Sequence, residues 1–137
     1  MLLITINASA AVVTNVNIPI NEVLFNPCNG ETVTLTGVSH VVVTTTLDGA
    51  GGSHNTMQNN IHLAGSGSLG NSYEGNMENT TVFNARVAVA STFVATLSMI
   101  SNGSAPNFEL HILLHATQKP DGTIAVFVSH FSAGCPA

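Results

Sequence analysis

The stretch FELHILLHATQKPDGTIAVFVSHF, residues 108 to 131, decides between a helical and a β fold for this chain. On a helix, His111 and His115 would lie about 5–6 Å apart on one face, where they could share a metal ion. On a strand, the same spacing separates them by about 13 Å, because each residue rises roughly 3.3 Å. A Pro-Asp-Gly turn lies between two runs in which apolar and polar residues alternate, and no helical stripe is visible. The stretch therefore predicts a β-hairpin, in which the two histidines share a face but no ion.

The same alternation of apolar and polar residues recurs along most of the chain. It predicts strands over residues 12–25, 32–47 and 53–64, and over 81–99 as one bent strand or as two strands joined near Ser91. Residues 65–80 are rich in Gly, Ser and Asn, and are expected to form a loop with one short strand around Tyr73. Pro19 indicates an edge strand or a bulge.

Seven or eight antiparallel strands without a helix of substance predict an all-β fold. The expected architecture is an antiparallel barrel, and a two-sheet β-sandwich is the alternative. Long bent strands with glycines in their middle, such as Gly37, favour the barrel. No repeat and no linker divides the chain, so residues 12–137 are expected to form a single β domain.

Residues 1–11, MLLITINASAA, have two interpretations. A short apolar run before Ala8-Ser9-Ala10 resembles the end of a secretory signal peptide with its small-residue cleavage site. Alternatively, the run LLITI is an extra N-terminal strand that docks on its own sheet or on a neighbouring copy.

Composition narrows the classes of partner. Only 7% of the 137 residues are charged, against a usual ~25%, and the net charge is −5. Arg86 and Lys119 are the only fixed cations, so no basic surface is available for a phosphate backbone, and nucleic acid is not expected as a partner. No run approaches the roughly 18 apolar residues of a membrane span.

Two cysteines, Cys28 and Cys135, lie near opposite ends of the chain. This placement suits one disulfide that ties the end of the first strand to the C-terminal tail, and two unrelated thiols are the alternative. A disulfide implies an oxidising compartment, so the protein is expected to be secreted, periplasmic or on the cell surface.

The six histidines supply most of the candidate binding residues. If Leu47 pairs with Ser53, His40 faces Asn60 and is a diagonal neighbour of His62, about 7–8 Å away, with Gln58 nearby. His40, His62, Gln58 and His115 are therefore the candidate ligand-binding residues. The histidine pair is also a weak candidate for a metal site, but a third ligand is missing, so no metal is expected.

Chemical motifs are otherwise scarce. Glu109 shares a strand face with His111 and could orient its imidazole as a general base, which makes the two residues weak catalytic candidates. His130 is expected on the apolar face of its strand, opposite Leu110. The segment GSGSLG, residues 65–70, fits a dinucleotide-loop pattern, but no apolar helix follows, so it is interpreted as a flexible loop and no cofactor is expected.

The segments IPINEVLFNPCNGETVTLTGVSHVVV and MISNGSAPNFELHILLH, together with Cys135, resemble a widespread group of small exported bacterial proteins of uncharacterised function. Members of that group share an N-P-C-x-G-E segment and a C-terminal cysteine. The resemblance spans most of residues 18 to 135. It implies an exported β domain with a Cys28–Cys135 bridge, and it carries no activity or functional residue.

Three functions are consistent with these features. The favoured one is an exported, disulfide-closed barrel that binds a small, largely apolar ligand, since small barrels hold ligands in their mouths. The second is a structural subunit that self-associates through residues 2–18 by donating its N-terminal strand to the next copy. The third is a small barrel enzyme with His/Glu acid–base chemistry, and the sequence favours binding over catalysis.

Overall fold

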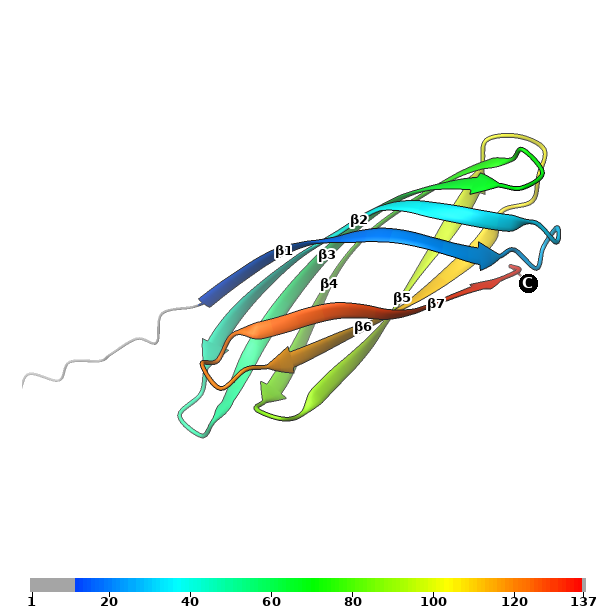
Figure 1. The fold of residues 1–137 in the computed structure, drawn as a ribbon. Helices are drawn as coiled ribbons and strands as arrows, with labels where there is room; N and C mark the ends of the chain where they lie inside the picture. Colours follow the sequence, from blue (N-terminus) through cyan, green and yellow to red (C-terminus); the bar gives the residue numbers. More distant parts are fainter. Residues whose placement is uncertain (1–11, 137) are drawn as a thin grey trace, which may run out of the picture.

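The structure is a computed structural model that describes residues 12–136. Seven strands follow one another as a meander, each hydrogen-bonded antiparallel to the next (Figure 1). The sheet curls into a nearly closed barrel, which confirms the predicted fold. The strands are β1 (Val12–Phe25), β2 (Thr32–Leu47), β3 (Gly52–Gly67), β4 (Ser72–Arg86), β5 (Ala90–Ser101), β6 (Phe108–Gln118) and β7 (Ile124–Gly134).

Period-two alternation located most of these strands correctly. The bounds of β1 and β2 agree with the prediction, and β6 and β7 form the predicted hairpin. Pro19 lies in β1, which is an edge strand, as expected for a residue that cannot donate to a ladder. Leu47 pairs with Ser53 and His40 with Asn60, so the predicted register of the β2–β3 hairpin is confirmed.

The prediction of a loop over residues 65–80 was wrong. β3 continues to Gly67 and β4 begins at Ser72, leaving a turn of four residues between them. The glycines that suggested a loop instead make room for core side chains. A Cβ atom on Gly75 would lie 2.4 Å from Met99 Sδ, and one on Gly65 would lie 3.0 Å from Val33 Cγ1. The strand break expected near Ser91 falls at residues 87–89 instead, where Ala88 has a φ of 66°.

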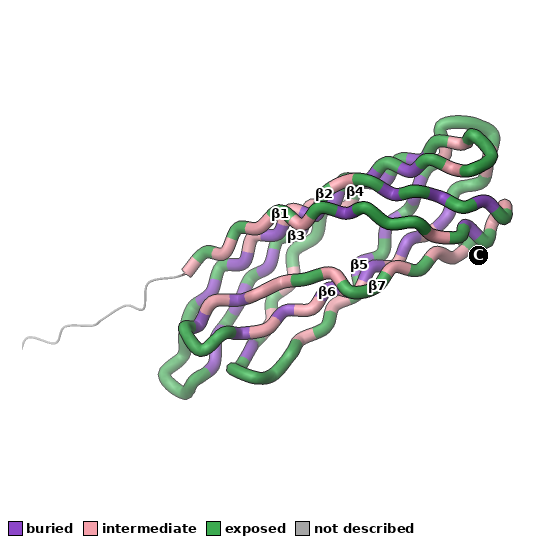
Figure 2. The backbone as a smooth tube through the Cα atoms, in the orientation of Figure 1, coloured by how far each residue is buried: buried purple, intermediate pink, exposed green. Residues whose placement is uncertain are grey.

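Buried positions recur along the strands of the barrel (Figure 2), and their apolar side chains form two clusters. One buried cluster contains Tyr73 and Phe108, whose rings meet edge to face with centroids 5.0 Å apart. A smaller cluster surrounds Met57. The ladder between β4 and β5 is short, with pairs only at Tyr73–Ser101 and Glu74–Ile100. Beyond those pairs, both strands contribute a phenylalanine to one aromatic contact, Phe83 to Phe93, with ring centroids 4.9 Å apart.

The expected position of His130 on the apolar face was wrong. A β-bulge shifts the register between β6 and β7, so that Leu114 pairs with Val128 but Leu113 pairs with His130. The extra residue, Ser129, reverses the alternation of faces from that point on. His130 is therefore exposed, and Phe131 takes the half-buried inward position.

Candidate functional site

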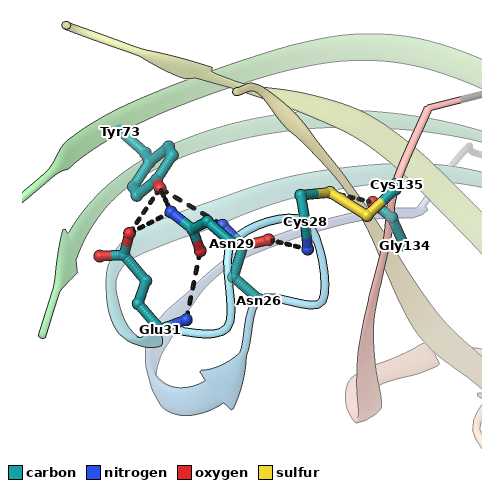
Figure 3. The surroundings of a disulfide bond; sticks show 7 residues. All are labelled: Asn26, Cys28, Asn29, Glu31, Tyr73, Gly134 and Cys135. Carbon is teal, nitrogen blue, oxygen red and sulfur yellow. Dashed lines mark hydrogen bonds between the residues drawn. A yellow bond between two sulfur atoms is a disulfide. The ribbon is translucent and has the colours of Figure 1, made fainter. Parts of the chain in front are cut away.

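The disulfide predicted between Cys28 and Cys135 is present, with Cα atoms 5.3 Å apart. It joins the β1–β2 loop, residues 26–31, to the segment that follows β7 (Figure 3). The loop has its own hydrogen bonds: the Cys28 amide donates to Asn26 Oδ1 at 2.9 Å, and the Gly30 amide donates to the Asn26 carbonyl at 2.9 Å. The disulfide therefore fixes the end of β1 to the end of β7 through an ordered loop.

Beside the disulfide, a buried carboxylate connects two hairpin loops. Glu31 is 1% exposed, and its Oε2 accepts hydrogen bonds from Asn29 Nδ2, from Asn71 Nδ2 at 2.6 Å and from Tyr73 OH at 2.9 Å (Figure 3 shows Asn29 and Tyr73). The Tyr73 oxygen in turn accepts a hydrogen bond from Asn26 Nδ2 at 3.3 Å. We call this set of residues, Asn26, Asn29, Glu31, Asn71 and Tyr73, the Glu31 network.

The electrostatics of the Glu31 network depend on amide donors. Burial raises the pKa of the Glu31 carboxyl, but hydrogen bonds from Asn71, Tyr73, Asn29 and the Leu69 backbone outweigh burial and hold the pKa below its ordinary value of 4.5. Burial and the hydrogen bond to Glu31 raise the pKa of Tyr73 above its ordinary value of 10.0. The network therefore keeps the carboxyl ionised and the phenol neutral. Their hydrogen bonds hold the β1–β2 loop against the β3–β4 hairpin.

The Glu31 side chain lies against the backbone of Gly67. A Cβ atom at position 67 would fall 1.3 Å from Glu31 Oε1, so any larger residue there would displace the carboxylate. The side-chain atoms that contact Glu31 Oε2 are amide and hydroxyl donors, which suit an anion and would repel a cation, whereas the buried Oε1 has no hydrogen-bond partner among the described residues. The arrangement therefore suits a structural contact between the two loops better than a metal site.

The second feature is the unsealed seam of the barrel, where the edges of β1 and β7 face each other (Figure 1). Within residues 12–136 no ladder joins these two strands. Val16 and Ile18 of β1, and Val126 and Val128 of β7, point toward the core but are only half-buried, whereas inward residues of the central strands, such as Val41, are fully buried. We call this region the β1–β7 seam.

The interior near the start of β3 is polar and internally satisfied. Thr45 Oγ1 donates to Asn55 Oδ1 at 2.7 Å, and Asn55 Nδ2 donates to Ser53 Oγ at 2.9 Å. Ser53 Oγ donates to Gln118 Oε1 at 2.9 Å, which links β3 to β6. These buried groups use one another as partners, so they are not set up to receive a ligand.

The four candidate ligand-binding residues lie on the outside of the barrel. His40 hydrogen-bonds Asn15 Oδ1 at 2.7 Å, toward β1, and His62 hydrogen-bonds Asn76 Oδ1 at 2.6 Å, toward β4. Gln58 is exposed on the same face. A surface depression of about 480 Å³ on β3 and β4 includes His62 but none of the other three; it is lined by Asn60, His62, Asn76, Met77 and Glu78.

His115 and the two catalytic candidates lie on the outer face of β6. His115 stacks on Phe127, with ring centroids 5.0 Å apart, and hydrogen-bonds Ser129 Oγ at 2.5 Å. His111 hydrogen-bonds Thr96 Oγ1 at 3.1 Å, and the structure gives it no hydrogen bond to Glu109. Across residues 12–136, no three His, Cys, Asp or Glu side chains are grouped so that they could hold a metal ion.

Sequence reasoning missed the Glu31 network. Asn26, Asn29 and Glu31 are all in the segment NPCNGE, so the polar character of the loop was visible. Asn71 and Tyr73, however, come from the β3–β4 hairpin, about 40 residues later in the chain, and their approach depends on the pairing of β3 with both β2 and β4.

Every regular element of residues 12–136 is a strand, so this part of the chain contains no helix able to cross a membrane. The expectations for residues 1–11, a signal-peptide remnant or an extra strand, concern residues outside the described part of the chain. In comparisons with known proteins, no family model, no curated protein and no solved structure matches this chain.

Proposed function

We propose that the protein is an exported binding module that accepts an extended polypeptide segment as an eighth strand in the β1–β7 seam. The proposal of export, to the periplasm, the cell surface or the medium, rests on the Cys28–Cys135 disulfide, because such bonds persist in oxidising compartments. The proposal of strand binding rests on the seam.

The observation that supports strand binding is the odd number of strands in the described meander. Six successive antiparallel pairings leave β1 and β7 running in the same direction. An antiparallel ladder cannot form between two such strands. One added strand can run antiparallel to both, and it would join the two edges of the β1–β7 seam in an up-and-down arrangement of eight strands.

The chemistry of the seam suits such a strand. Edge strands present unpaired backbone N–H and C=O groups, which are the groups that bind an added strand. Behind them, Val16, Ile18, Val126 and Val128 offer half-buried apolar surface for every second side chain of the added segment. Backbone pairing and alternate apolar contacts are the two components of β-strand addition.

A small, largely apolar ligand stays a prediction of the sequence, with less support from the geometry. The interior that would hold it is filled by the two apolar clusters and by paired polar groups. An enzymatic role has weaker support, because Glu109 and His111 lie on the outer face of β6 without a mutual hydrogen bond.

Amide hydrogen exchange followed by NMR tests strand binding on the unreduced full chain. The protein is measured alone and with an excess of a ten-residue peptide of alternating valine and threonine. We expect the seam-facing amides of β1 and β7 to exchange at least about tenfold more slowly with the peptide than in the protein alone, which corresponds to about 1.4 kcal/mol of added protection. Protection already present without the peptide would mean that the chain itself fills the seam.

A matched pair of variants localises the effect. Val16→Lys places a charge on the inward face of β1, and Asn17→Lys places the same charge on its exposed outward face. The first should abolish the protection and the second should retain it. The proposal is refuted if these amides exchange freely both with and without the peptide. A bound mass of a few hundred daltons without edge protection would instead support the small-ligand alternative.

A further inference from the structure

We infer that the strand that fills the β1–β7 seam comes from a second copy of this chain, and that it is residues 2–11, exchanged reciprocally between two copies. This inference rests on the proposed function, since it names the partner of the same seam. Three observations carry it: the pattern of the segment, the position from which it leaves the barrel, and the turns that this chain uses elsewhere.

The segment has the pattern of the strands that it would join. In LLITINASAA, residues 2–11, apolar Leu2, Ile4 and Ile6 alternate with Thr5, Asn7 and Ser9. The central strands of the barrel alternate in the same way, with apolar side chains inside and Thr, Asn and His outside. A strand of this pattern can place its isoleucines over the half-buried valines of the seam while its polar residues continue the outer surface.

The geometry of the seam fixes where the segment enters. The Cys28–Cys135 disulfide fastens the ends of β1 and β7 together, so the seam is closed at that end (Figure 1). The opposite end, where β1 begins at Val12 and β7 begins at Ile124, carries no such link. Residues 2–11 directly precede Val12, so the donor segment originates at the same end of the barrel at which the seam is open.

Two copies related by a two-fold axis satisfy the required direction. The axis, perpendicular to the strands, places the β1 strands of the two copies antiparallel to each other. A donor segment that continues the line of its own β1 then runs antiparallel to β1 and β7 of the other copy, as the seam requires. Ten residues span about 33 Å as a strand, close to the full length of the 11-residue β7, so the segment is long enough to cover the part of the seam that is open.

Insertion of the segment into the seam of its own copy would need a tight reversal before Val12. Four of the six hairpin loops use a glycine with positive φ, namely Gly30, Gly51, Gly70 and Gly122. Residues 7–11, NASAA, contain no glycine. A reversal there would have to place a residue other than glycine at positive φ, as Ala88 does in the turn between β4 and β5, and it would take residues 7–11 out of the added strand. Exchange with a second copy needs no reversal and leaves all ten residues for pairing.

Native mass spectrometry and size-exclusion chromatography with light scattering test this inference on the unreduced full chain. Intact mass first establishes that residues 1–11 are present, and we expect a dimer. Ile4→Lys, on the apolar face of the segment, should give monomers. Thr5→Lys, on its polar face, is the matched control and should leave the dimer intact. If both lysines disrupted folding, Ile4→Asn would replace the first variant.

A mixing experiment identifies donor and acceptor. Ile4→Lys removes the donor but retains an intact seam, and Val16→Lys damages the seam but retains an intact donor. Each variant alone should be monomeric. Their mixture should form heterodimers, recognised by mass, because one of the two junctions can still form.

The failure of the inference is distinguishable from the failure of the proposed function. A chain that lacks residues 1–11 as isolated, a monomer at high concentration, or a dimer unaffected by Ile4→Lys would overturn the exchange between copies. Strand binding in the seam would then still be tested by hydrogen exchange with the valine–threonine peptide. Protection of the β1 edge by that peptide would keep the proposed function, whereas free exchange would refute both.

Discussion

Removal of the Cys28–Cys135 disulfide should lower the free energy of unfolding by about 5 kcal/mol. The bond closes a loop of 107 residues. In the chain-entropy model, a loop of that size restricts the unfolded chain by about 16 cal/mol/K, which is about 5 kcal/mol at 25 °C. Domains of this size have a total stability of about 5–15 kcal/mol, so the loss would be a third of the stability or more.

The double variant Cys28→Ala/Cys135→Ala is the appropriate perturbation. Cys28 packs partly buried against the larger core cluster, and alanine removes its sulfur without adding a hydroxyl group there. Urea unfolding should show a lower midpoint and a larger m-value, because the unfolded variant exposes more surface than the cross-linked chain. Dithiothreitol should lower the stability of the wild type to that of the variant and leave the variant unchanged.

Kinetics separate the two ways in which the disulfide could act. If it acts on the unfolded chain, the variant should refold between about three and four orders of magnitude more slowly and unfold at nearly the wild-type rate. A loss below about 1.5 kcal/mol would refute the entropic argument. A loss that appears only in the unfolding rate would mean that the bond stabilises native contacts at the seam.

Three further predictions concern the Glu31 network and the close-packed glycines. Because the pKa of Glu31 is lower in the folded chain than its ordinary 4.5, its ionised form should stabilise the fold above that pH, and this contribution should disappear as the pH falls through the folded value. The difference in urea midpoint between Glu31→Gln and wild type should therefore be largest above about pH 4.5 and should shrink as the pH is lowered below that value. A difference that stays the same at every pH would contradict this. Tyr73→Phe removes a hydroxyl that hydrogen-bonds Glu31 and should cost about 2 kcal/mol in urea unfolding, with no change in the circular dichroism of the fold. Gly37→Ala should lower the free energy of unfolding by about 3 kcal/mol or more, because its Cβ would lie 1.9 Å from the His62 carbonyl oxygen. Gly49→Ala, whose Cβ would have no atom within 4 Å, is the control and should be nearly neutral in the same urea assay. Equal effects of the two substitutions would refute the packing argument.

The fold was largely predictable because its strands alternate faces with few interruptions. The bounds of β1 and β2, the β2–β3 register and the Pro-Asp-Gly hairpin all follow from local pattern and turn chemistry. The errors come from non-local causes. Gly75 suggested a loop, but it lies in a strand at a position where Met99 of β5 leaves no room for a side chain. His130 lies on the opposite face from the one predicted because of a bulge in the pairing of β7 with β6.

The candidate sites were less predictable than the fold. Alternation correctly placed His40 and His62 on one face of the β2–β3 hairpin, but it did not indicate that this face is the outer one. The disulfide followed from the placement of two cysteines. The Glu31 network required Asn71 and Tyr73 to approach from a different hairpin, which no local pattern indicates. The seam was missed because the edges of a barrel become known only when the number of its strands is known.

The meander also determines the order in which the protein can assemble as its chain is synthesised. Each strand forms ladders only with the strands directly before and after it in the sequence. Every hairpin from β1 onward can therefore form once its own residues have emerged. The disulfide is the exception, because Cys28 follows the first strand and Cys135 follows the last. Cys28 can therefore pair with Cys135 only after all seven strands have emerged, and because residues 12–136 contain no other cysteine, no alternative disulfide can form among them before that point.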